Sequence, residues 1–131
     1  MVSSERDGNS HAWHLVPAAW FEAQPADADY LPEAFASEGF IHLTFTTADV
    51  IDVGNRYYRT LPGDWLALWI DLTRSAAPVQ FSAVDVRHQF PHLHGPLERD
   101  AIVSIHSVQR GEDGTFLAIN TLPADARRSD A

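Results

Sequence analysis

Cysteine is absent from the 131-residue sequence, so the chain has no disulfide, no thiolate metal ligand and no cysteine nucleophile. Lysine is absent as well, and all 9 basic residues are arginines. Without lysine, the chain lacks both a Schiff-base nucleophile and the phosphate-binding lysine of a P-loop. These absences exclude several common enzyme classes before any motif is considered.

Long apolar runs are also missing. No run approaches the roughly 18 residues that cross a bilayer, and residues 1–10 lack the apolar stretch of a signal peptide. We therefore predict a cytoplasmic protein without a membrane partner. The balance of 9 basic against 18 acidic residues gives a net charge of −9. That charge disfavours long nucleic acids, because binding them requires neutralising phosphates, but a local arginine is compatible with a small phosphorylated ligand.

The length and composition are typical of one globular domain, with 45% hydrophobic residues. We predict a single domain over residues 11–120, with flexible polar tails at 1–10 and 121–131. The sequence gives no indication of the oligomeric state.

The order of the predicted elements indicates an α+β fold. Apolar patterning predicts six strands, with the nearly continuous apolar run Trp65–Leu72 as a central strand covered on both faces. Thr46 and Asp49 resemble a capping box that opens a helix ending near Arg59. The absence of helices between the last strands excludes a regular βαβ sheet. The other predicted strands are His11–Val16, Phe40–Phe45, Val79–Val86, Ile102–Gln109 and Thr115–Asn120, and the other helices are Ala18–Gln24 and Leu31–Ser37.

Histidine is abundant, with 7 residues in the chain. His14 lies in the first predicted strand and His42 in the second. His92 and His94 lie in the segment Gln89–Pro96, which its prolines stiffen and which we predict to be a recognition loop. For each of these four histidines, a structural role that satisfies backbone carbonyls remains an equal alternative.

Four blocks of sequence carry a family resemblance. Tyr30 and the runs Glu38–Thr44, Asn55–Tyr58 and Phe90–Pro96 resemble the family known as domain of unknown function 952. The resemblance covers roughly residues 14–120. Members of that family look like compact relatives of the ADP-ribosyltransferase fold, in which a split and mostly antiparallel β-sheet cradles NAD. The resemblance implies this α+β fold, with helices concentrated in the N-terminal half.

The resemblance also implies a binding cleft for a nucleotide, either NAD or an ADP-ribose-like ligand, although no cofactor follows from the residues alone. It assigns His14 and His42 to the reacting end of the ligand. The family's late acidic residue would fall at Ser82, which carries no charge, and Asp85 or Glu98 would replace it only if the backbone brought them in. We therefore expect little or no NAD hydrolysis or transferase activity. The remaining ligand contacts that we predict are Tyr30, Thr44, Arg56, His92 and His94, with His94 standing where the family more often has tyrosine.

Two alternatives come from the residues themselves. His92 and His94, with His88 four residues before His92, have the ring type and spacing of a histidine metal site, but no third ligand is marked by its spacing, and we predict no metal ligands. The aromatic residues, including four tryptophans, would serve a non-catalytic interaction module as well as a core.

Overall fold

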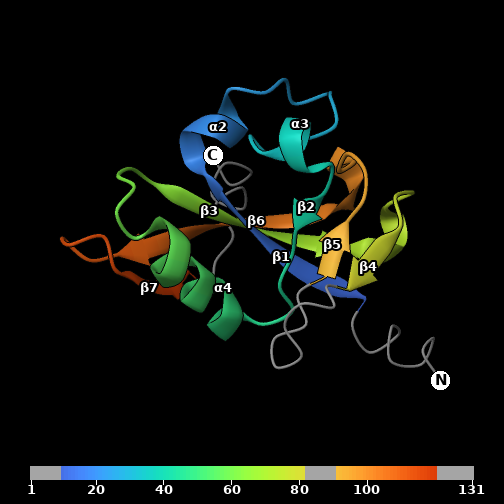
Figure 1. The fold of residues 1–131 in the computed structure, drawn as a ribbon. Helices are drawn as coiled ribbons and strands as arrows, with labels where there is room; N and C mark the ends of the chain where they lie inside the picture. Colours follow the sequence, from blue (N-terminus) through green and yellow to red (C-terminus); the bar gives the residue numbers. More distant parts are fainter. Residues whose placement is uncertain (1–9, 82–90, 121–131) are drawn as a thin grey trace.

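The computed structural model describes residues 10–81 and 91–120, and within them seven strands form two sheets (Figure 1). Every strand pair is antiparallel. The four-stranded sheet has the order β1-β3-β6-β7, with β1 at His11–Pro17, β3 at Trp65–Asp71, β6 at Ile102–Arg110 and β7 at Phe116–Ile119. The three-stranded sheet has the order β2-β5-β4, with β2 at Ile41–His42, β5 at Pro91–Leu93 and β4 at Val79–Phe81.

The helices are short. Helix α4 packs against β1 and β7 on one face of the larger sheet, whereas α2 contacts β1 and β3 and lies with α3 at the top of the view (Figure 1). The predicted mixed α+β class with mostly antiparallel strands is confirmed. The helices are α2 (Ala18–Glu22), α3 (Phe35–Glu38), α4 (Thr47–Val53), the π-helix η1 (Gly54–Tyr58) and the 3₁₀ turns η2 (Leu72–Arg74) and η3 (Arg99–Ala101).

The predicted central strand is confirmed. Strand β3 lies between β1 and β6, and Ala67, Leu68 and Ile70 are fully buried. Leu68 and Ile70 face the main core, whereas Ala67 faces a second cluster that it shares with Trp13. Burial on both faces explains why the sequence of this strand is apolar at successive positions instead of alternating.

Two predicted elements need correction, and a third is described only in part. The segment Gln89–Pro96, predicted as a loop, contains strand β5, which pairs with β2 and β4. Pro91 is the first residue of this strand, a position where proline is tolerated. Of the predicted strand Phe40–Phe45, only Ile41–His42 forms a strand, and Thr44 forms an isolated bridge with Trp13. The predicted strand Val79–Val86 is described only over Val79–Phe81, and the rest lies outside the described residues.

The predicted long helix after Thr46 is divided in two. The Thr46 hydroxyl accepts a hydrogen bond from the Asp49 backbone N–H at 3.1 Å, which confirms the predicted N-cap. At Gly54 the helix changes from α to π geometry. A Cβ at Gly54 would lie 2.6 Å from the Phe116 ring, so this position needs glycine for the close approach of helix and hairpin. None of the helices in the described part of the chain is long and apolar enough to span a membrane.

Candidate functional site

The two sheets touch at the edge of β1 and then separate. The Trp13 N–H donates to the Thr44 carbonyl at 2.7 Å, and the Thr44 N–H donates to the Trp13 carbonyl at 2.9 Å. Continuing this antiparallel register would place His42 opposite Leu15. Instead, the His42 carbonyl accepts a hydrogen bond from the side chain of His14, at 2.7 Å from Nδ1.

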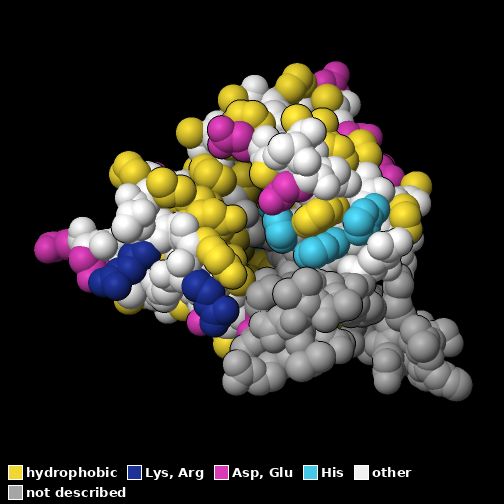
Figure 2. Space-filling model, in the orientation of Figure 1, with side chains coloured by type: hydrophobic (Ala, Val, Ile, Leu, Met, Phe, Trp, Pro, Cys, Tyr) yellow, Lys and Arg dark blue, Asp and Glu magenta, His cyan; other side chains and the backbone are white. Residues whose placement is uncertain are grey.

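A cavity of about 790 Å³ opens where the sheets separate. Its volume falls within the range typical of small-molecule sites. Its apolar walls come from β1, α4 and the π-helix, and Figure 2 shows the opposite lip as a group of histidine side chains next to acidic ones. Polar or charged side chains that line it include His14, Tyr30, Glu33, Glu38, His42, Thr44, Arg56, Tyr57, Tyr58, Trp65 and His92.

His14 and Tyr30 form a buried hydrogen-bonded pair in the wall of this cavity. A carbonyl oxygen can only accept, so His14 Nδ1 carries the proton that it donates to the His42 carbonyl. Burial lowers the pKa of His14 to about 4, which keeps the ring neutral at pH 7. The unprotonated Nε2 therefore accepts from the Tyr30 hydroxyl at 2.9 Å. Burial also raises the pKa of Tyr30, so that the pair resists charge.

Glu38 and His42 form a second pair at the lip. Helix α3 ends at Gly39, whose φ of 81° reverses the chain and brings the Glu38 carboxylate within 3.0 Å of His42 Nε2. His92 lies beside them, with its ring 5.1 Å from the ring of His42 and stacked on Phe40. Burial, and to a smaller extent the neighbouring His42, lowers the pKa of His92.

The π-helix presents Arg56, Tyr57 and Tyr58 to the mouth of the cavity. The Asn55 side chain fixes this turn by donating to the Phe116 carbonyl at 3.0 Å and accepting from the Phe116 N–H at 2.7 Å. The Tyr58 ring stacks on Trp65 at 4.7 Å. Burial and the charge of Glu38 raise the pKa of Tyr58. π-Helical turns are frequent at functional sites, because they redirect side chains from a regular helical path.

Two buried polar atoms of residues that line the cavity lack a hydrogen-bond partner among the described residues, namely Thr44 Oγ1 and Trp65 Nε1. Each such atom costs about 1–3 kcal/mol when it is shielded from water and left unpaired. Both atoms belong to residues that line the same cavity. The residues around the cavity therefore include one hydroxyl and one indole N–H whose hydrogen bonds the described protein groups do not satisfy.

The model of the family described as "Protein of unknown function (DUF952)" matches residues 15–105. The chain belongs to this family. The predicted family is thereby confirmed, whereas the predicted likeness to ADP-ribosyltransferases is not part of what the match supports. No curated protein matches the chain.

The fold is similar to that of protein CC0527 from Caulobacter crescentus. Its crystal structure is 18% identical, with a TM-score of 0.69, over 82% of this chain and 93% of that one. Its solution NMR structure is also 18% identical, with a TM-score of 0.63, over 86% and 93% of the two chains. At this identity the likeness establishes the fold alone.

The structure brings most of the predicted site residues of this DUF952 domain together. Six line the cavity, whereas His94 does not and instead lies with its ring 5.4 Å from Phe40. Glu98 accepts hydrogen bonds from the Ser75 hydroxyl and the Ala76 N–H, and it does not line the cavity. Ser82, Asp85 and His88 lie outside the described residues. The six are His14, Tyr30, His42, Thr44, Arg56 and His92.

Sequence reasoning missed Glu38, Tyr58 and Trp65 as site residues, although each lines the cavity. The sequence does contain a signal for Glu38, because it lies four residues before His42 with a glycine between them. Nothing local indicates that Trp65, at the start of an apolar strand, faces a cavity. No group of three or more metal-ligating side chains occurs among the residues that the structure describes.

Proposed function

We propose that the cavity binds a small nucleotide of the NAD or ADP-ribose class. The observation that carries this proposal is the pair of unsatisfied buried atoms, Thr44 Oγ1 and Trp65 Nε1, on two residues that line one cavity of suitable volume. A nucleotide supplies an acceptor for the indole N–H and a hydroxyl or amide partner for the threonine. Its flat rings suit aromatic walls such as the stacked Tyr58 and Trp65.

The edge of β1 adds a backbone recognition element. Side-chain and backbone directions alternate along a strand, so the N–H and C=O of Leu15 point to the same edge as those of Trp13. Beyond the Trp13–Thr44 pair, this edge borders the cavity, which Leu15 lines. An adjacent N–H and C=O match the hydrogen-bonding pattern of a carboxamide, a group that NAD carries and ADP-ribose lacks.

Charge supports a phosphorylated ligand that is small. Arg56 lines the mouth of the cavity, where it pairs with Asp52 at 3.1 Å and keeps further guanidinium donors for a phosphate. The net charge of −9 opposes long polyanions. One arginine at the mouth fits a ligand whose ring system enters the cavity and whose phosphates remain near the surface.

Calorimetric titration with NAD, ADP-ribose and a 2′-phosphorylated ribonucleotide tests the proposal. We expect at least one of them to bind wild-type protein. The Thr44→Val variant should bind it about 2- to 13-fold more weakly, because it loses one hydrogen bond of about 0.5–1.5 kcal/mol. Thr44→Ser is the matched control, since it keeps the hydroxyl and should bind nearly as wild type. Absence of binding by all three ligands would refute the proposal.

A further inference from the structure

His14 uses both of its ring nitrogens within the protein. Nδ1 donates to the His42 carbonyl and Nε2 accepts from the Tyr30 hydroxyl. The ring is buried and neutral, with a pKa of about 4. No ring nitrogen is left for a ligand unless one of these bonds breaks. This differs from the direct contact with the reacting end of the ligand that the family resemblance implies for His14.

The bond to His42 has a consequence for the sheet. Thr44 and Trp13 exchange two backbone hydrogen bonds, and in the same register the next such pair along the strands is Leu15 with His42. The carbonyl that would accept from the Leu15 N–H is the one that accepts from His14 Nδ1. On its other side, β2 pairs with β5. The His14 imidazole therefore takes the place of the Leu15 N–H as the donor to the His42 carbonyl, and the backbone pairing of β1 with β2 does not continue to Leu15.

We propose that His14 is a positioning residue that keeps β1 and β2 apart beyond the Trp13–Thr44 pair. By occupying the His42 carbonyl, the imidazole leaves the N–H and C=O of Leu15 facing the cavity as the recognition edge. Tyr30 fixes the ring from the other side. The claim about the ladder stands on its own, whereas the claim that a ligand uses this edge rests on the proposed function.

Amide hydrogen exchange at Leu15, measured by NMR on the full chain, tests the claim about the ladder. His14→Gln fills similar space and can reach Tyr30, but it lacks a donor at the position of Nδ1. We expect Leu15 to exchange about tenfold more slowly in this variant than in wild type, because its N–H gains the His42 carbonyl. General destabilisation would speed exchange, so slower exchange at one amide in an altered protein is specific to ladder closure.

Two variants serve as controls. His14→Asn places an amide N–H near the position of Nδ1, so exchange at Leu15 should stay close to the wild-type rate. Tyr30→Phe removes the hydroxyl but leaves the bond to the His42 carbonyl, and it should also leave Leu15 unchanged. Unchanged or faster exchange at Leu15 in His14→Gln would overturn the proposal.

Calorimetry with NAD on the same variants tests the claim about the ligand. We expect His14→Gln to lower the affinity about tenfold or more and His14→Asn to stay within about threefold of wild type. Full affinity in His14→Gln with loss in His14→Asn would show that Nε2 is what matters, and would overturn the proposal. If amide exchange at Leu15 slows in His14→Gln as expected, but the wild type binds none of the nucleotides, the proposed function fails. The inference that His14 keeps the strands apart then still holds.

Discussion

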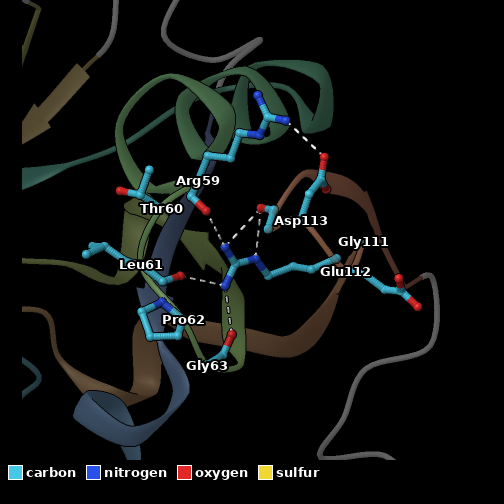
Figure 3. A pocket seen from close by; sticks show the side chains of 10 residues that line it. Arg59, Thr60, Leu61, Pro62, Gly63, Gly111, Glu112 and Asp113 are labelled. Carbon is cyan, nitrogen blue, oxygen red and sulfur yellow. Dashed lines mark hydrogen bonds and ion pairs between the residues drawn. The ribbon is translucent and has the colours of Figure 1, made fainter.

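Two concave regions in the described part of the chain differ in how their polar groups are satisfied. The smaller one lies between the segment 59–63 and the turn 111–114 (Figure 3). Arg110 lines it and makes five hydrogen bonds, all to backbone carbonyls, and its guanidinium also lies 4.4 Å from the centre of the Phe116 ring. In the larger cavity, Thr44 Oγ1 and Trp65 Nε1 have no partner among the described residues.

This difference separates a structural site from a binding site. An arginine whose donors are all engaged has no capacity left for a ligand, so the smaller region joins the β6–β7 hairpin to the turn that follows the π-helix. Unsatisfied buried atoms lower stability and are rare in native proteins, so each of the two calls for a partner that the described residues do not supply. Depth or shape alone would not distinguish the two regions, whereas their hydrogen bonds do.

The largest expected effect concerns Arg110. Arg110→Met removes five hydrogen bonds and leaves several carbonyls unpaired, so we expect the free energy of unfolding to fall by about 4 kcal/mol. Arg59→Met is the control, because its exposed ion pair with Asp113 contributes little. Urea denaturation measures both. If Arg110→Met lowered the free energy of unfolding no more than Arg59→Met does, the smaller region would not have the structural role assigned to it.

The second effect is a pH dependence of stability. Burial lowers the pKa of His14 from 6.5 to about 4 in the folded protein. The unfolded chain therefore binds the proton more readily between these values. Stability from His14 is complete above pH 6.5 and falls by about 3 kcal/mol as the pH drops to about 4.

Urea denaturation at several pH values between 7 and 4 measures this dependence. His92, whose pKa is also lowered, contributes in the same direction, so the comparison with His14→Gln isolates the His14 part. An equal pH dependence in wild type and His14→Gln would contradict a neutral His14 in the wall of the cavity.

A smaller effect of opposite sign is expected at Thr44. Thr44→Val keeps the shape of the side chain but removes a buried hydroxyl that lacks a partner. We expect the unliganded protein to become more stable by about 1 kcal/mol, because the cost of the unpaired group disappears. Thermal unfolding without nucleotide measures this change. A clear loss of stability would show that the hydroxyl is already satisfied in the free protein.

The smallest expected signal is catalytic. We expect little or no nicotinamide release from NAD, because Ser82 offers no charge and Glu98 is engaged with Ser75 and Ala76 away from the cavity. Glu38 does line the cavity, in a pair with His42. Release measured by chromatography in wild type, and abolished by Glu38→Gln but not by Glu98→Gln, would contradict this expectation and assign the reaction to Glu38.

Sequence reasoning succeeded where local pattern decides structure. The apolar run of β3 requires burial on both faces, and the Thr46 hydroxyl with the Asp49 N–H defines a helix start within four residues. It failed where a distant contact decides. Strand β5 depends on pairing with β2 and β4, and the π-helix depends on Asn55 and Gly54 meeting Phe116.

The candidate site shows the same division. Family motifs located His14, Tyr30 and His42, but only the fold shows that Tyr30 occupies one ring nitrogen of His14 and His42 the other. The unsatisfied indole of Trp65 leaves no sign in the sequence, because any tryptophan in an apolar strand is expected to be core. Roles that depend on which hydrogen bonds remain open cannot be predicted from residue type and spacing.

The indole N–H resonance of Trp65 tests the central claim most directly. The four tryptophans give four indole signals in a two-dimensional ¹⁵N NMR spectrum, and each is assigned by a Trp→Phe variant. On titration with NAD or ADP-ribose, the signal of Trp65 should move most, because its N–H gains an acceptor. The signal of Trp69, which does not line the cavity, should stay nearly fixed. A Trp65 signal that does not move at saturating concentrations of both nucleotides would contradict the account.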